Sequence, residues 1–178
     1  MVESSKKTIL KTIRISEELD DLLRKDANIN RTSVNTLVFS ILTKYAEWDR
    51  YAQKFGFVSC SRRAYSAIIE SVESEKLQSV MEKVLEVPIS MMMLWFGKAN
   101  TETLLSLFSL IDRYCGLFKH EVEKDGRDYA VTLYHDFGTN FSIFLKRYFE
   151  KAIKSIEGIA PRVELGDSFV TFNFRQHA

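Results

Sequence analysis

The 178-residue chain has few of the residues that cross-link or interrupt a fold. Its only two cysteines, Cys60 and Cys115, show no C-x-x-C spacing, which argues against a zinc ribbon or a disulfide framework and suits a reducing compartment. Two prolines and seven glycines stand against thirteen phenylalanines and seven tyrosines. This balance predicts long regular elements, few open linkers and a packed apolar core.

Long apolar runs and a strong net charge are also lacking. No run reaches the roughly 18 apolar residues that mark a membrane span, and the first seven residues lack the apolar core of a signal peptide. We therefore expect no membrane contact and a cytoplasmic location. The net charge of +1 gives no strong overall field toward nucleic acid. Residues 1–15 are locally basic, with four basic residues against one acidic residue and a net charge of +3.

The segment Thr8–Ile15 has the alternating pattern of a β-strand. Its isoleucines share one face and the residues between them share the other, because side chains along a strand alternate. The residues expected to point outward are Leu10, Thr12 and Arg14. Lys11 falls on the inward face near the strand end, from which a long side chain can reach water.

Two capped helices are expected directly after this strand. Ser16 is followed by two glutamates, the pattern of an N-cap hydroxyl with acidic residues in the first turn. Ser33 is expected to cap a second helix after a loop at residues 28–32, and Gly56 to end it. Apolar residues recur at intervals of three and four in both helices, as in helices that bury one face.

A strand and two short helices cannot form a stable unit alone. A single strand has unpaired backbone groups along both edges and no neighbour with which to pair. The simplest remedy is a second copy of the chain, with the two strands antiparallel about a two-fold axis and four helices packed on one face of the ribbon. Dimerisation is then part of folding.

Three stretches carry a resemblance to a known family: Thr12-Ile13-Arg14-Ile15, Ser16-Glu17-Glu18-Leu19 and Arg31-Thr32-Ser33-Val34-Asn35. They resemble the ribbon–helix–helix repressors, over about the first fifty residues. The resemblance implies a homodimeric, sequence-specific transcription regulator whose strand pair enters the major groove of double-stranded DNA. The base contacts it implies are Leu10, Thr12 and Arg14. The phosphate contacts expected from it and from the basic arm are Lys6, Lys7, Ser33, Val34 and Asn35.

The sequence departs from the family pattern at two places. Leu10 stands where a polar reader of bases is usual, and the loop between the helices lacks the glycine often found there. Two alternatives stay open. Residues 9–15 could be an ordinary edge strand of a larger sheet, or the protein could be a ligand-binding or protein-interaction domain with an N-terminal dimerisation arm.

The remainder of the chain predicts an α+β domain, so we divide the protein into residues 1–54, the ribbon–helix–helix domain, and residues 55–178, a sensory or oligomerisation domain. About five mostly antiparallel strands covered by helices are expected. The five expected strands are 89–96, 117–123, 129–135, 162–165 and 168–175, the last four as two hairpins, and residues 57–60 are a candidate for a further short strand. Helices are expected from Ser61, Ser74 and Thr101, and over residues 141–156.

Little in the second part indicates chemistry. His120 and His135 lie on opposite arms of one expected hairpin, but no third ligand has a recognisable spacing, so we expect no metal site. No Gly-rich phosphate loop or nucleophile elbow is present, so we expect no cofactor and no enzyme. His135 and Asp136 end a strand before a helix, where ligand-binding groups often lie, and are the candidates for a small-molecule effector. Alternatively, Asp136 or Asn140 caps that helix.

Overall fold

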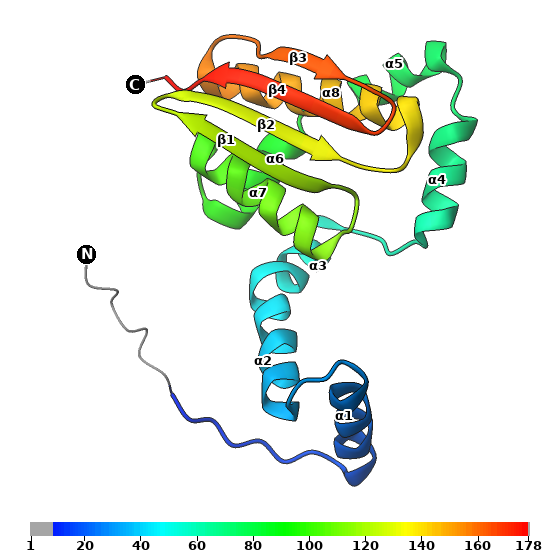
Figure 1. The fold of residues 1–178 in the computed structure, drawn as a ribbon, viewed down its shortest axis with the longest axis vertical. Coiled ribbons are helices and arrows are strands. Elements are labelled where there is room, and N and C mark those ends of the chain that lie inside the picture. The colour runs from blue at the N-terminus through cyan, green and yellow to red at the C-terminus, as the bar shows by residue number, and fades with distance from the viewer. Residues whose placement is uncertain (1–8, 178) are drawn as a thin grey trace. The chain divides into compact units, whose positions relative to one another are not determined.

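The computed structural model describes residues 9–177 and, within them, all side chains except those of Ser74, Glu75, Gln78 and Val80 (Figure 1). The chain divides into two compact units, Met1–Ala46 and Glu47–Ala178. The architecture is α+β, as expected, with helices first and an antiparallel sheet near the C-terminus.

The first unit contains helices α1 (Glu17–Ile29) and α2 (Val34–Lys44). Both begin where expected: the Ser16 hydroxyl accepts from the backbone N–H of Leu19 at 3.3 Å, and the Ser33 hydroxyl accepts from that of Thr36 at 3.0 Å. Residues 9–16 form neither helix nor strand in this single chain. The expected ribbon is therefore absent from the described residues, because all described strands lie between residues 119 and 175 and none pairs with this segment.

The backbone continues from α2 through a π-helical turn, Tyr45–Asp49, into α3 (Arg50–Phe55), which ends at Gly56 as expected. Gly56 has a φ of 84°, a left-handed conformation that glycine adopts without steric cost. The prediction of a strand at residues 57–60 is wrong, since these residues form a loop. The Phe57 ring instead packs on Trp48, with 5.3 Å between ring centroids, and on Trp95.

Four further helices precede the sheet: α4 (Arg62–Ser71), α5 (Ser74–Glu82), α6 (Val87–Phe96) and α7 (Thr101–Tyr114). The prediction of a strand at Ile89–Phe96 is also wrong, because these residues belong to α6. Pro88 lies in the first turn of this helix, where a missing N–H removes no intrahelical hydrogen bond. Met92 and Trp95 of α6 are buried, so the apolar run reflects a helix packed within the domain rather than a strand.

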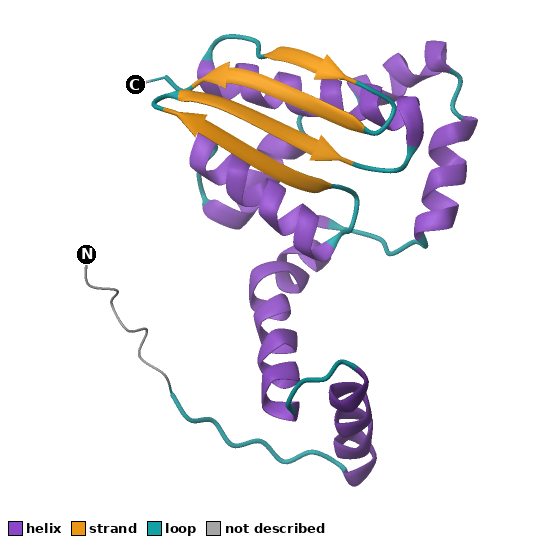
Figure 2. Ribbon diagram, viewed as in Figure 1, coloured by secondary structure: helices purple, strands orange, loops and turns teal. Residues whose placement is uncertain are grey.

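The sheet has four described strands, fewer than the roughly five expected: β1 (Lys119–Asp125), β2 (Asp128–Tyr134), β3 (Arg162–Leu165) and β4 (Phe169–Arg175). All neighbours pair antiparallel in the order β1-β2-β4-β3. Both expected hairpins are confirmed. Helix α8 (Gly138–Glu157) connects β2 to β3, and Figure 2 shows α7 and α8 on one face of the sheet.

The core lies between this face and α7 and α8. Val131 of β2 pairs with Phe172 of β4, and both side chains are fully buried. Phe108 of α7 and Phe149 of α8 meet edge to face beneath them, with ring centroids 4.6 Å apart. The alternate residues of β2 and β4 face away from the helices. Among the described residues, no helix combines the length and apolar character needed to cross a membrane.

The start of α8 differs from expectation. Its N-cap is Phe137, and no side chain caps it. Asn140 donates instead to the carbonyls of Ile69 and Val72, at 3.2 and 2.9 Å, and so caps the last turn of α4. Asp136 forms an ion pair with Arg62. Neither residue expected as a possible cap of α8 takes that role.

Candidate nucleic-acid interface

Residues 10–14 present their side chains to solvent. Leu10 is 92% exposed, and Thr12 and Arg14 are also exposed. Arg14 forms no hydrogen bond or ion pair with any other described residue. The other expected contacts of the basic arm, Lys6 and Lys7, lie outside the described residues.

The expected phosphate site at Ser33, Val34 and Asn35 forms the beginning of α2. The first intrahelical bond runs from the Leu37 N–H to the Ser33 carbonyl at 2.9 Å, so the N–H groups of Val34 and Asn35 precede it and point out of the helix. The Ser33 hydroxyl is engaged with Thr36 as the helix cap. This site therefore offers two backbone amides at the positive end of a helix dipole, an arrangement suited to a phosphate.

The loop before this site contains a residue in an unusual conformation. Arg31 has a φ of 50°, the only positive φ of a non-glycine residue in the described part of the chain. Hydrogen bonds hold it there: its N–H donates to the Asn28 carbonyl at 3.1 Å, and the Thr32 N–H donates to the Ala27 carbonyl at 2.9 Å. The sequence shows that the loop between the helices lacks the usual glycine. It did not show that Arg31 would take the left-handed conformation instead.

The described part of the first unit leaves most of its apolar side chains exposed. Ala27 is its only buried residue, at 2% exposure. The exposed large apolar residues of this unit are Ile9, Leu10, Ile13, Ile15, Leu19, Leu22, Ile29, Phe39, Ile41, Leu42 and Tyr45. They include the isoleucines of the expected strand and residues from the expected stripes of both helices. We call this set the N-terminal apolar surface.

His135, a candidate for effector binding, is buried among protein partners. Its Nε2 lies 2.9 Å from the Ser142 hydroxyl, and its Nδ1 accepts from the Phe137 N–H at 3.3 Å. Burial lowers the pKa of His135, and the negative charge of Asp136 opposes this effect. Asp136 is exposed and paired with Arg62. The side-chain hydrogen bonds of the two candidate residues thus go to different partners.

The other strand histidine belongs to a group that the sequence did not reveal. The His120 Nδ1 lies 2.8 Å from an Asp112 carboxylate oxygen, and its Nε2 lies 3.1 Å from the Ser109 hydroxyl. A serine hydrogen-bonded to a histidine that is hydrogen-bonded to an aspartate is also the arrangement of hydrolase triads. However, the Ser109 hydroxyl donates to the Leu105 carbonyl, and Ser109 lies inside α7, where backbone amides bond along the helix. The group anchors β1 to α7.

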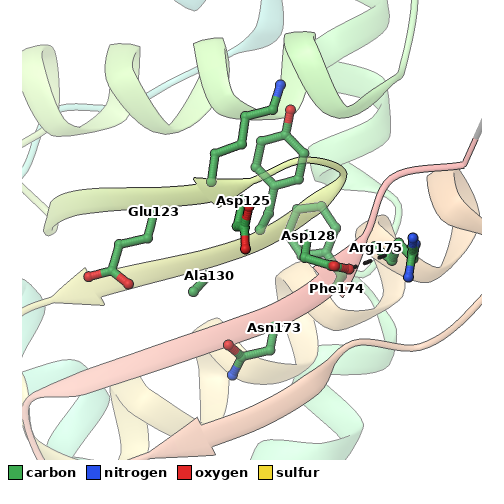
Figure 3. Close-up of a pocket in the computed structure, with 9 residues that line it drawn as sticks. Glu123, Asp125, Asp128, Ala130, Asn173, Phe174 and Arg175 are labelled. Carbon is green, nitrogen blue, oxygen red and sulfur yellow. Dashed lines mark ion pairs between the residues drawn. The ribbon is translucent and has the colours of Figure 1, made fainter.

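His120 and His135 share no partner, and no group of three or more His, Cys, Asp and Glu residues in the described part could hold a metal ion. A hollow of about 610 Å³ lies on the sheet beside the β1–β2 turn (Figure 3). Asp128 and Arg175 form an ion pair in it, at 3.9 Å. Five of its nine lining residues are charged. No residue expected from the sequence to bind a ligand lines it.

Comparisons of the chain with models of known protein families, with curated proteins and with solved structures found no match. In the sequence, residues of the N-terminal apolar surface flank the exposed Thr12 and Arg14 and belong to the two helices on either side of the amides that begin α2.

Proposed function

We propose that the protein is a homodimeric, sequence-specific DNA-binding transcription regulator of the ribbon–helix–helix kind. Residues 9–15 of one subunit pair antiparallel with the same residues of a second subunit, and α1 and α2 of both subunits cover one face of the ribbon. The observation that carries this proposal is the N-terminal apolar surface: large apolar side chains dominate a unit whose described part contains a single buried residue, Ala27.

A second subunit accounts for this surface physically. Many exposed large apolar side chains in one small unit favour association, because their exposure to water is unfavourable. Leu10, on the opposite face of the proposed ribbon, is the exception. The backbone of residues 9–15 also needs hydrogen-bond partners, which an antiparallel copy supplies. A two-fold interface uses the same residues twice, so Ile13 and Ile15 of each subunit meet their own counterparts or near neighbours. A single dimer interface thus buries the apolar side chains and pairs the backbone hydrogen-bonding groups.

The opposite face of such a ribbon has the chemistry of base recognition. Side chains at positions 10, 12 and 14 alternate away from the isoleucines. A two-stranded ribbon fits the major groove, where arginine can donate two hydrogen bonds to guanine and a leucine methyl can contact a thymine methyl. The amides of Val34 and Asn35 then bind a backbone phosphate beside the groove. The ribbon would then supply sequence specificity through base contacts, and the start of α2 would position the protein through phosphate contacts.

The test is selection from a random DNA library with the full chain, followed by sequencing of the retained DNA. The proposal predicts a palindromic consensus, because a two-fold dimer reads two equivalent half-sites. Arg14→Ala should then lose discrimination at one position of each half-site by about 1–3 kcal/mol. Lys25→Ala removes another exposed positive charge, from α1, and is the matched control. Retained DNA without any consensus, or equal discrimination by both variants, would contradict the proposal.

A further inference from the structure

His135 lies where three parts of the second unit meet: the end of β2, the first turns of α8 and the turn between β3 and β4. It is 7% exposed. Its backbone N–H donates to the Ser168 carbonyl at 2.8 Å, which ties the end of β2 to that turn. Its ring contacts Ser142 of α8, whose hydroxyl donates onward to the Gly166 carbonyl at 2.6 Å. His135 therefore connects all three parts, the turn through its backbone N–H and α8 through its ring.

The hydrogen bonds around the ring fix its protonation state. The Ser142 hydroxyl gives its proton to the Gly166 carbonyl, so it can only accept from His135, and Nε2 must carry a proton. The Phe137 N–H donates to Nδ1, so Nδ1 must keep its lone pair. The neutral ring with the proton on Nε2 meets both requirements. A second proton, on Nδ1, would place two donors against each other and remove the bond to Phe137. The bond from Nε2 to Ser142 would survive, so the force that opens the junction is the cost of a buried imidazolium, which water can solvate only when these parts separate.

The surroundings of the ring offer a cation little compensation. The Phe141 ring lies edge to face against it, with centroids 4.9 Å apart. Of the nearby carboxylates, Asp136 is paired with Arg62 of α4, and Asp167 of the β3–β4 turn accepts from the Thr139 hydroxyl at 2.6 Å. Tyr65 of α4 packs against Phe137 and Phe141, and burial raises its pKa to about 12, so it stays neutral. Residues 138–145 of α8 and 169–174 of β4 have no ionisable side chain.

We propose that His135 is a pH-sensitive latch, which in its neutral form holds the first turns of α8 and the β3–β4 turn to the end of β2 and on protonation releases them. The direction follows from burial, which lowers the pKa of His135 below its ordinary value of 6.5 in the closed form. The open form binds the proton more tightly. Closure is therefore complete above pH 6.5 and weakens as the pH falls from there toward the pKa of the closed form.

The experiment is hydrogen exchange of the full chain between pH 7.5 and 5, corrected for intrinsic exchange rates. Protection over residues 141–146 and in the β3–β4 turn should fall by up to about tenfold per pH unit below pH 6.5, the limit for one linked proton. His135→Asn should abolish this dependence, because its Oδ1 can accept from Phe137 and does not ionise. His120→Asn, which removes the other strand histidine, should keep it. Protection that does not change with pH, or an equal response in His135→Asn, would overturn the latch.

A second measurement covers the case in which His135→Asn does not fold. Imidazole ¹⁵N chemical shifts of the unmodified protein distinguish the two neutral tautomers directly. At pH 7.5 the ring of His135 should carry its proton on Nε2, and it should titrate below pH 6.5 together with the loss of protection. A ring protonated on Nδ1 at pH 7.5, or a titration above pH 6.5, would also overturn the proposal.

Discussion

The hydroxyl of Ser33 accepts a hydrogen bond from the backbone N–H of Thr36 at 3.0 Å and thereby begins α2. Replacing an N-cap serine with alanine leaves this amide without its partner, so Ser33→Ala should lower the free energy of unfolding by about 1 kcal/mol. Ser40→Ala is the matched control, because Ser40 lies inside α2 and its hydroxyl bonds only to the helix carbonyl of Leu37. Urea unfolding at one fixed protein concentration measures both. Equal losses in the two variants would contradict the capping role.

Arg31 should be one of the few arginines whose replacement by glycine stabilises this protein. Its φ of 50° is costly for a residue with a Cβ atom, by about 1–2 kcal/mol, and glycine avoids this cost. The greater freedom of glycine in the unfolded chain offsets part of the gain. We expect Arg31→Gly to raise the free energy of unfolding by about 0.5–1 kcal/mol. Arg31→Ala removes the same guanidinium but keeps the Cβ atom. An equal increase in the free energy of unfolding in that variant would contradict backbone strain at Arg31 as the cause.

Asp112 should make the second unit sensitive to acid. Its burial disfavours the charged form, but hydrogen bonds from Lys119 and His120 outweigh this and hold its pKa below the ordinary value of 3.8. A carboxylate with a lowered pKa stabilises the folded state above its unfolded pKa, and this stabilisation is lost as the pH falls through the folded value. Asp112→Asn should therefore cost more than about 1 kcal/mol at pH 7 and less at pH 3, which lies below the ordinary value of 3.8.

The control for this prediction is Asp128→Asn. Asp128 is exposed and lies 3.9 Å from Arg175, so its loss should change stability by less than about 1 kcal/mol at either pH. Chemical unfolding of each variant at pH 7 and pH 3, compared with the unmodified protein, gives the four differences. If Asp112→Asn lowers the free energy of unfolding equally at both pH values, the charge of the Asp112 carboxylate is not the source of the loss.

The sequence predicted those features that depend on local hydrogen bonds. Ser16, Ser33 and Ser61 all cap helices as expected, because each cap joins a hydroxyl to an amide three residues away. Gly56 ends α3 as expected for a similarly local reason, the left-handed backbone that follows a helix. Such interactions leave a signal in a few consecutive residues.

Features that depend on distant residues were missed. An apolar run such as Ile89–Phe96 fits a buried strand or a buried helix equally well, and only its packing within the domain decides. The bond from Ser142 to Gly166 crosses 24 positions of the chain, so the structural role of His135 could not be predicted from its neighbours. The base-contact residues Thr12 and Arg14 remain predictions, because their roles need a second subunit and DNA.

Ile13 provides the sharpest test of that second subunit. It is 65% exposed in the single chain, yet in the proposed dimer it packs between the ribbon and the helices. A carboxylate buried there without a partner costs several kcal/mol, so Ile13→Asp should convert a dimer into a monomer at micromolar concentration. Val58→Asp is the matched control, since Val58 is 87% exposed and lies outside the N-terminal apolar surface. Light scattering coupled to size exclusion measures both masses. A monomeric unmodified protein, or a dimer that survives Ile13→Asp, would mean that this surface is not covered by a second copy of the chain.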